Sequence, residues 1–288
     1  MKGIILAGGL GTRLHPSTIS VSKQLLPIYD KPLIFYPLSN LMAAGINEVL
    51  IISTPDSIVL FKKLFGNGDH LGIKLIYEAQ ENPNGIAEAF IIGENFIDGD
   101  DVTLVLGDNI FYGNQIVEFI KTHSSQKLNG AKVFAYKVPD PERYGVVEFD
   151  DEFSVLSIEE KPKNPKSNYA VTGLYLYDSR VSELAKSLLP SARGELEITD
   201  LNNIYLEEKN LEVCLLDTGT AWLDAGTPDS LLEAAHFVQT IQNRQMIQIA
   251  CLEEIAFKQD FISAAAFKEL AKSSPNNKYG DYLRSLLG

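Results

Sequence analysis

A run of glycines followed by two basic residues stands near the start of the chain and has the composition of an anion-binding loop. The stretch GIILAGGLGTRL places Gly8, Gly9 and Gly11 after a short apolar segment, with Arg13 next and Lys23 further on. Glycine lets a backbone approach a ligand closely, and successive backbone amides can cradle a phosphate group. We expect this loop to hold a triphosphate, with Arg13 and Lys23 neutralising it from the sides.

Two familiar phosphate-binding loops do not match this run. A dinucleotide-binding fingerprint that starts at Gly9 needs a glycine at position 14, where Leu14 stands. A Walker loop that starts at Gly8 needs Gly-Lys-Ser/Thr at positions 13–15, where the sequence reads Arg-Leu-His. The loop is therefore of another kind, and the glycines taken alone are equally consistent with a tight turn after a strand.

Two aspartates far apart in the chain form a second candidate group. Asp108 follows the apolar run VTLVLG, and Asp224 stands in AWLDAGT. A side chain that follows a buried parallel strand lies at the sheet edge where α/β proteins bind ligands, although an aspartate there is often only a turn former or helix cap. Carboxylates from distant segments suit Mg²⁺, which takes one or two of them plus substrate phosphates. The pair is a candidate magnesium site.

Composition and charge limit the class of protein. The 288 residues carry a net charge of −13, which argues against a nucleic-acid partner. The first 32 residues are an exception, because they contain Lys2, Arg13, Lys23 and Lys31 against a single acidic residue, Asp30. A basic, glycine-rich patch in an acidic protein suits a small anion.

The cysteines and the apolar runs exclude further classes. Cys214 and Cys251 lie in different segments without the spacing of a metal site, so we expect neither a disulfide nor zinc. No apolar run approaches the ~18 residues that a membrane span requires. We therefore expect a cytoplasmic protein without a membrane partner.

The elements that must position these residues follow from periodicity. Apolar β-forming runs alternate with helical stretches, which predicts an α/β fold with a Rossmann-like mixed, mostly parallel central sheet flanked by helices. Strand-like pieces after residue 138 predict an extension of the same sheet. The expected strands are 3–7, 48–53, 73–79, 102–107, 131–138, 144–150, 153–162 and 169–178. The expected helices are 33–44, 56–65, 86–97, 114–125, 179–188 and 196–209. From residue 227 the pattern is helical to the end, with Thr227 as cap and Pro228 at the first helical position.

Long blocks of the sequence resemble one enzyme family. The stretch GGLGTRLHPSTISVSKQLLPIYDKPLI resembles the signature loop of the sugar-phosphate nucleotidyltransferases. The blocks LVLGDNIFYG, DPERYGVVEFD, EEKPKNPKSNYAVTGLYLYD, RGELEITDLN and AWLDAGT extend the resemblance over essentially the whole chain. These blocks are most similar to members that join dTTP to glucose 1-phosphate, giving dTDP-glucose and pyrophosphate for dTDP-rhamnose and polysaccharide biosynthesis. A uridylyltransferase, a different sugar 1-phosphate and a non-catalytic nucleotide-sugar sensor are the alternatives.

The resemblance also implies site residues, a cofactor and an assembly. It implies Mg²⁺ on Asp108 and Asp224, a homotetramer, and catalytic roles for Arg13, Lys23 and Lys161, the last on the sugar's phosphate. The implied nucleotide contacts are Gly8, Gly9, Gly11, Thr12, Arg13, Lys23, Gln24, Gln80 and Gly85. The implied sugar-phosphate contacts are Asn109, Tyr144, Gly145, Glu160, Lys161, Val171 and Arg193. A solvated position for Lys161 and a pairing of Arg193 with the acidic helix nearby are the simpler alternatives.

A domain division follows from the same resemblance. Residues 1–226 are expected to form the catalytic core, with a nucleotide-binding half over about 1–110 and a sugar-phosphate-binding half over about 111–226. Residues 227–288 are expected to form a helical segment at a subunit interface, with a regulatory site. Thr218 and Lys258 stand where the family commonly has arginines near that site, and lysine cannot reproduce the bidentate phosphate contact of arginine. We therefore expect weakened feedback inhibition, which an assay with dTDP-rhamnose would measure.

The implied reaction needs charge stabilisation rather than a base. Both substrates are anions, and two unit charges 4 Å apart repel by about 4 kcal/mol at an effective dielectric constant of ~20. The attacking phosphate oxygen is already deprotonated at neutral pH. Catalysis therefore reduces to in-line positioning and to cations placed around the two phosphates.

Overall fold

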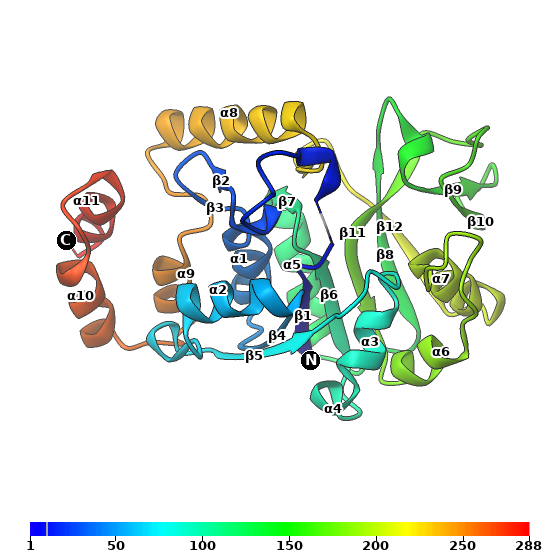
Figure 1. Cartoon of the computed structure of the whole chain (residues 1–288), viewed down its shortest axis with the longest axis horizontal. Coiled ribbons are helices and arrows are strands. Elements are labelled where there is room, and N and C mark those ends of the chain that lie inside the picture. The colour runs from blue at the N-terminus through cyan, green and yellow to red at the C-terminus, as the bar shows by residue number, and fades with distance from the viewer. Residues whose placement is uncertain (10, 288) are drawn as a thin grey trace.

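A nine-stranded mixed sheet with helices on both faces forms the centre of the molecule (Figure 1). The structure is a computed structural model and describes residues 1–9 and 11–287. The strand order is β10-β9-β11-β6-β1-β4-β5, and β8 and β12 continue from β11 on a branch of the same sheet. The predicted α/β fold is confirmed.

The first part of the sheet is parallel. β1 (Lys2–Leu6) pairs in parallel with β4 (Glu48–Ser53) and β6 (Val102–Leu106), and β4 pairs in parallel with β5 (Lys74–Ala79). The carboxyl ends of parallel strands meet at one edge of a sheet. The glycine loop after β1, the segment after β5 and Asp108 after β6 are therefore brought together.

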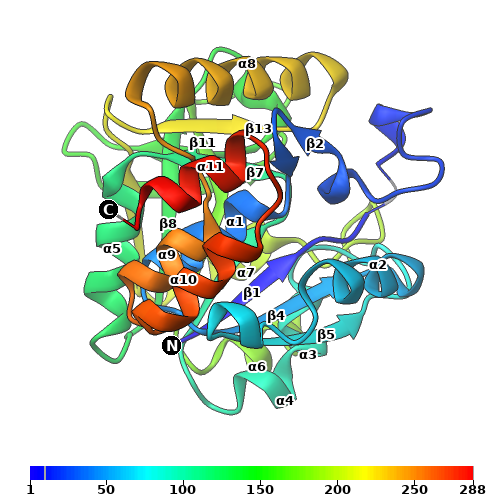
Figure 2. The ribbon, with the colours of Figure 1, turned by 90° about the vertical axis from the view of Figure 1, so that its left-hand side faces the viewer.

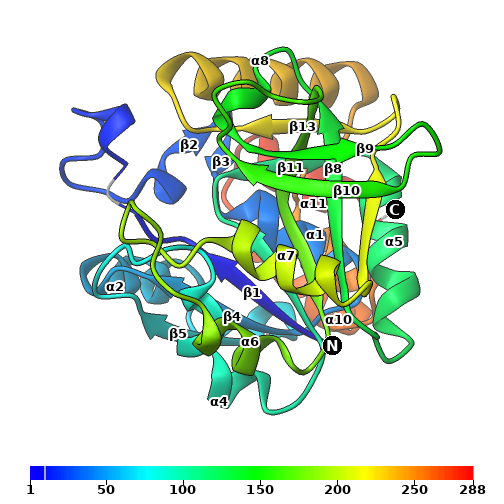
Figure 3. The ribbon, with the colours of Figure 1, turned by 90° about the vertical axis from the view of Figure 1, so that its right-hand side faces the viewer.

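The second part of the sheet extends it, as the strand-like pieces after residue 138 predicted. The long strand β11 pairs antiparallel with β6, β8 and β9, while β9 pairs antiparallel with β10 and β12 runs parallel to β8. Figure 3 shows β9 and β10 at the end of the molecule, with α7 packed beside them. The bounds are β8 (Ala131–Lys137), β9 (Gly145–Phe149), β10 (Val155–Glu160), β11 (Tyr169–Tyr177) and β12 (Leu211–Leu215).

Four short strands form two small ladders that the periodicity did not predict. β2 (Pro27–Ile28) pairs with β3 (Lys31–Pro32), and β7 (Asn109–Tyr112) pairs antiparallel with β13 (Ala221–Asp224). Strands of two to four residues are too short for an alternating pattern to be read. The second ladder joins segments that are far apart in the chain.

The helices lie close to their predicted positions, with one exception. The stretch predicted as a single helix over 86–97 forms two short helices that meet at Gly93, a poor helix former that packs closely on the sheet. A Cβ at Gly93 would lie 3.1 Å from a side-chain carbon of Ile4 on β1.

No helix among residues 1–9 and 11–287 is long and apolar enough to cross a membrane. The bounds are α1 (Phe35–Ala43), α2 (Pro55–Phe65), α3 (Glu88–Ile92), α4 (Glu94–Ile97), α5 (Asn114–Ser124), α6 (Val181–Ser187) and α7 (Ile198–Glu207).

Each face of the sheet has its own apolar core. Ile5 and Ile51 pack with α1, α2 and α5 on one face, whereas Ile4 and Leu50 pack with α3, α6 and α7 on the other. Successive residues of a strand point to opposite faces of a sheet. Burial on both faces therefore explains why these strands read as continuous apolar runs.

Residues 227–287 are helical, as predicted, but they form four separate helices. α8 (Pro228–Gln245) begins as expected, with the Thr227 hydroxyl accepting a hydrogen bond from the Ser230 amide at 3.2 Å. Figure 2 shows the three helices that follow gathered at one end of the molecule. They add apolar side chains to the core that also holds α1, so they pack on the sheet domain of the same chain. Their bounds are α9 (Leu252–Lys258), α10 (Ala264–Ser273) and α11 (Lys278–Ser285).

Candidate active site

Two adjoining cavities open at the carboxyl ends of the parallel strands. The larger has a volume of about 660 Å³ and lies against β6, β9, β11 and the start of α7. The smaller has a volume of about 200 Å³ and lies against the segments that follow β1 and β5. Both are lined by Ile86, Leu106, Asp108 and Glu195. Asp108 therefore stands where the two cavities meet.

The cavities bring together nearly all the residues that the sequence singled out. The larger is lined by all seven expected sugar-phosphate contacts, namely Asn109, Tyr144, Gly145, Glu160, Lys161, Val171 and Arg193. It is also lined by Thr12, Arg13 and Asp224. The smaller is lined by Gly8, Gly9, Lys23, Gln24, Gln80 and Gly85. Gly11 lines neither cavity; it forms a turn with φ 58°, and its carbonyl accepts a hydrogen bond from Thr18 at 2.9 Å.

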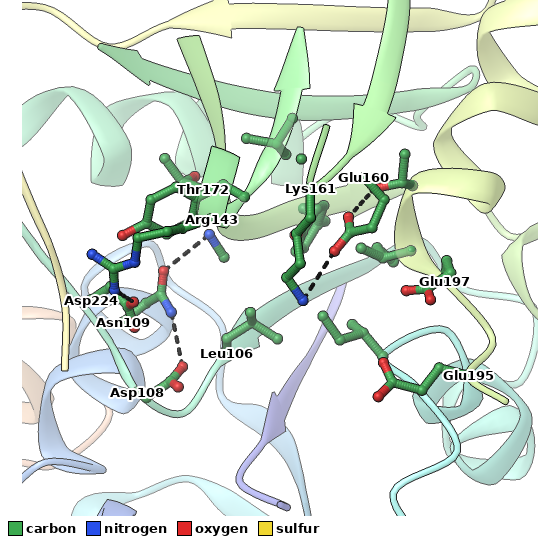
Figure 4. A pocket seen from close by; sticks show the side chains of 18 of the residues that line it. Leu106, Asp108, Asn109, Arg143, Glu160, Lys161, Thr172, Glu195, Glu197 and Asp224 are labelled. Atoms are coloured by element: carbon green, nitrogen blue, oxygen red, sulfur yellow. Dashed lines mark hydrogen bonds and ion pairs between the residues drawn. The ribbon is translucent and has the colours of Figure 1, made fainter. Parts of the chain in front are cut away.

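Asp108 is paired with Lys23 at the junction of the cavities. The Lys23 ammonium forms an ion pair with Oδ2 of Asp108. The Asn109 amide donates to Oδ1 of Asp108 at 2.9 Å (Figure 4). Burial opposes ionisation of Asp108, but the charge of Lys23 and these hydrogen bonds outweigh it and hold the pKa of the carboxyl below its usual value. Asp108 is therefore a charged carboxylate at neutral pH.

Asp224 reaches the same place because β13 pairs with β7. Asn109 lies opposite Asp224 in that ladder, and the Ala225 amide donates to the Asp108 carbonyl at 3.0 Å. Burial, and after it repulsion from Asp108, raise the pKa of Asp224 above its usual value. Asp224 therefore takes up a proton at a higher pH than Asp108 does.

Arg143 adds a cation beside this pair that sequence reasoning missed. Its Nη2 lies 3.5 Å from Oδ2 of Asp224, and its Nη1 donates to Asp140 at 2.6 Å. The guanidinium lies 5.3 Å from the centre of the Tyr144 ring, which fixes its direction further. Its position next to Tyr144, an expected sugar contact, is the one signal in the sequence that could have pointed to it.

Asn109 fixes the geometry between the aspartates and the sheet. Its Oδ1 accepts hydrogen bonds from the Gly173 amide at 3.0 Å and from the Trp222 ring nitrogen at 2.6 Å. A Cβ at Gly173 would lie only 2.5 Å from that Oδ1, so the glycine is what lets Asn109 approach the backbone. With Oδ1 held in this way, the amide nitrogen must point at Asp108.

The opposite wall of the larger cavity carries a charged network. Thr199 donates to Glu160 at 2.6 Å, and the Lys161 ammonium lies 3.3 Å from the other Glu160 oxygen (Figure 4). Arg193 donates to both oxygens of Glu197, at 3.1 and 2.7 Å. Arg193 thus pairs with the carboxylate at the start of α7, as the simpler alternative expected, while it also lines the cavity.

Comparison with known proteins decides the family. The model of the nucleotidyl transferase family matches residues 2–241, which is most of the chain. The chain belongs to the nucleotidyl transferase family. A curated relative from Neisseria meningitidis is 58% identical over 100% of this chain and 99% of its own length, and one from Mycobacterium tuberculosis is 51% identical over 100% and 99%. Both carry the name glucose-1-phosphate thymidylyltransferase.

Solved structures agree with the family. A putative glucose-1-phosphate thymidylyltransferase from Bacillus anthracis, crystallised in complex with a sucrose, has a TM-score of 0.76 and 43% identity. The match covers 82% of this chain and 94% of that one. A UDP-glucose pyrophosphorylase complexed with UDP-glucose has a TM-score of 0.72 at 23% identity, over 83% of this chain and 98% of that one, which is a likeness of fold alone.

The aspartate pair of this nucleotidyl transferase fits a hard divalent cation. Two carboxylates face one junction, and carboxylate oxygens are the ligands that Mg²⁺ prefers. In the described part of the chain, no three or more His, Cys, Asp or Glu side chains converge as a complete ligand set. The other positions around a metal would therefore be filled by substrate oxygens and water.

Other residues that line the two cavities of the nucleotidyl transferase were not predicted from the sequence. Most of them neighbour a predicted residue in the chain or across a ladder, so their role follows from the folded structure rather than from a local pattern. In the larger cavity these are Arg143, Thr172, Gly173, Tyr175, Glu195, Glu197, Ile198, Thr199 and Trp222, together with Ile86 and Leu106. In the smaller cavity they include Leu6 and Pro83.

Gly85 holds the smaller cavity in shape, and its replacement is expected to destabilise the nucleotidyl transferase. Its φ is 111°, and a Cβ there would lie 2.3 Å from the Leu196 carbonyl oxygen, so Gly85→Ala must shift the backbone. We expect the free energy of unfolding to fall by about 2–3 kcal/mol in urea titrations. Gly99→Ala is the matched control, because Gly99 has φ 74° but open space around it, and we expect about 1 kcal/mol there. Equal losses in the two variants would contradict the role of the Leu196 contact.

Proposed function

We propose that this nucleotidyl transferase transfers the thymidylyl group of dTTP to α-D-glucose 1-phosphate, giving dTDP-glucose and pyrophosphate. Two observations support the proposal: the names of relatives with more than half of their residues identical, and the paired cavities that meet at Asp108. The smaller cavity, with its glycine loop and Gln80, suits the nucleotide. The larger, with Glu160 and Lys161, suits the sugar and its phosphate.

The cations around the junction fit the charge of these substrates. Lys23 lies on the nucleotide side, and Lys161 and Arg193 lie on the sugar side. Arg13 and Arg143 line the larger cavity near Asp224, with the Arg13 guanidinium 3.3 Å from where a Cβ on Gly226 would stand. A site of this kind stabilises two phosphates that would otherwise repel each other by several kcal/mol.

We propose that Asp108 and Asp224 hold Mg²⁺ when the substrates bind. The cation would supply charge neutralisation at the α-phosphate and the leaving pyrophosphate. The Lys23 ammonium is paired with one oxygen of Asp108, and a metal bound to that oxygen would displace the ammonium toward the triphosphate. Asn109 keeps Asp108 aimed at the junction throughout.

The side chains are not required to act as a base. The phosphate oxygen of glucose 1-phosphate is already ionised, so Lys161 and Arg193 need only hold it in line with the bond that breaks. The oxygen attacks the α-phosphorus, the bond to the bridging oxygen breaks, and pyrophosphate leaves with its electrons. No covalent bond to the protein forms in this scheme.

A substrate panel tests the proposed function. The purified protein is incubated with Mg²⁺, one nucleoside triphosphate and one sugar 1-phosphate, and pyrophosphate and the nucleotide sugar are measured. We expect the highest kcat/KM for dTTP with glucose 1-phosphate. A clear preference for UTP or for an amino-sugar phosphate would replace this function by the corresponding transferase. If the protein bound nucleotide sugars but did not form them, it would be a non-catalytic nucleotide-sugar sensor.

The assembly is a separate proposal. The homotetramer that the family resemblance implies rests on that resemblance alone. Light scattering of the purified protein distinguishes a tetramer from a dimer or a monomer, and a monomer that is fully active would exclude any need for the assembly in catalysis.

A further inference from the structure

The side-chain amide of Gln80 is clamped at its nitrogen end. Gln80 is buried, and its Nε2 donates to the carbonyl of Gly85 at 3.2 Å and to Oε2 of Glu88 at 2.7 Å. Glu88 is itself held, because the Asn84 amide donates to its other oxygen at 2.8 Å. Glu88 is the first residue of α3, so the clamp is attached to a helix that packs on the sheet.

This clamp permits only one orientation of the Gln80 amide. A backbone carbonyl and an ionised carboxylate can accept hydrogen bonds but cannot donate them. If the amide turned over, its oxygen would face two acceptor oxygens and lose both hydrogen bonds. A buried amide left in that state is strongly disfavoured.

With the nitrogen held, the Gln80 oxygen must face the other way, toward the glycine loop. A Cβ added to Gly8 would lie 2.8 Å from Gln80 Oε1, so this oxygen lies directly against Gly8. Gly8 and Gln80 both line the smaller cavity. The cavity therefore presents a hydrogen-bond acceptor of fixed direction at this point of its wall.

We propose that Glu88 is a positioning residue that sets the choice of base by locking Gln80 as an acceptor. The inference rests on the proposed function, in which the smaller cavity takes the base. Thymine and uracil carry an N3–H donor that a fixed acceptor can receive. Cytosine has an unprotonated N3 at the same place, so two acceptors would face each other. A Gln80 amide that was free to turn over could serve either base.

The comparison of dUTP with dCTP isolates this effect, because the two differ only at positions 3 and 4 of the ring. The ratio of their kcat/KM values with glucose 1-phosphate is measured for wild type, Glu88→Leu and Glu88→Gln. Glu81→Leu is the matched control, since Glu81 is an exposed glutamate of the same segment and loses the same charge. Calorimetric binding of dUTP and dCTP without glucose 1-phosphate repeats the comparison without turnover.

The expected pattern separates positioning from a merely structural role. Wild type and Glu81→Leu favour dUTP over dCTP by about 100-fold or more, and Glu88→Leu lowers that ratio about tenfold or more. Glu88→Gln restores it to within about threefold of wild type, because a glutamine oxygen can still accept from Gln80. An unchanged ratio in Glu88→Leu, or an equal loss in Glu88→Gln, overturns the inference.

If the proposed function is wrong, the measurements give a different result from the one expected if only the role of Glu88 is wrong. If wild type forms no nucleotide sugar, calorimetry still shows whether dUTP and dCTP are distinguished and whether Glu88→Leu removes the distinction. Equal binding of both nucleotides to wild type overturns the acceptor role of Gln80 itself. Should Glu88→Leu not fold, Asn84→Ala, which removes the partner of Glu88, is expected to shift the ratio in the same direction.

Discussion

Lys23→Met is expected to lower kcat/KM for dTDP-glucose formation by about 10³-fold. Methionine keeps most of the length of the lysine stem but removes the ammonium that stands beside Asp108 at the junction of the two cavities. The charge that develops on the leaving pyrophosphate then has one cation fewer. The buried Asp108 carboxylate also loses the partner that keeps its pKa low.

The control for this variant is Lys63→Met on α2, an exposed lysine outside the cavities. Its activity should stay within about twofold of wild type. Thermal unfolding of both variants shows whether a loss of activity comes from a destabilised fold or from the missing ammonium in the site. If Lys23→Met kept activity within about threefold of wild type, the role of Lys23 in phosphoryl transfer would have to be given up.

Asp108→Asn is expected to lower kcat by about 10³-fold, because a neutral amide is a weak ligand for Mg²⁺. Asp224→Asn should produce a loss of similar size, since each aspartate supplies one of the two fixed carboxylates. In the presence of dTTP, Mn²⁺ binding followed by electron paramagnetic resonance should weaken about tenfold or more in both variants.

Asp151→Asn provides the matched control for the aspartate variants. Asp151 is an exposed turn residue, so its amide variant should bind Mn²⁺ and turn over as wild type does. Wild-type metal affinity in Asp108→Asn and Asp224→Asn together would contradict the assignment of these two aspartates. If metal affinity fell in only one of these two variants, the metal site would be restricted to the aspartate replaced in that variant.

Much of the architecture could be predicted from local patterns. The strands of the sheet are buried on both faces, and their continuous apolar runs gave positions within a few residues of the observed ones. Asp108 can be singled out as a candidate site residue because it follows the buried strand β6. Gly8 and Gly9 can be singled out because they follow β1. These features depend on residues close together in the chain.

The rest depends on contacts between distant segments. The ladder of β7 with β13, which carries Asp224 to Asp108, joins strands of four residues whose pairing leaves no local signal. Arg143 and Glu88 lie close to predicted site residues in the chain. Arg143 gains its place in the site from its contact with Asp224, and Glu88 from its contact with Gln80. Side-chain direction in a loop or at a helix start is set by packing, which a single sequence does not reveal.

The stereochemistry at the α-phosphorus tests the central claim most directly, namely that the two cavities align glucose 1-phosphate for direct attack on dTTP. A single isomer of dTTP carrying sulfur at the α-phosphate is converted with glucose 1-phosphate, and the configuration of the product is determined by phosphorus NMR. One in-line displacement predicts inversion at phosphorus. Retention would mean two displacements through a covalent nucleotidyl–enzyme intermediate, and it would contradict the account.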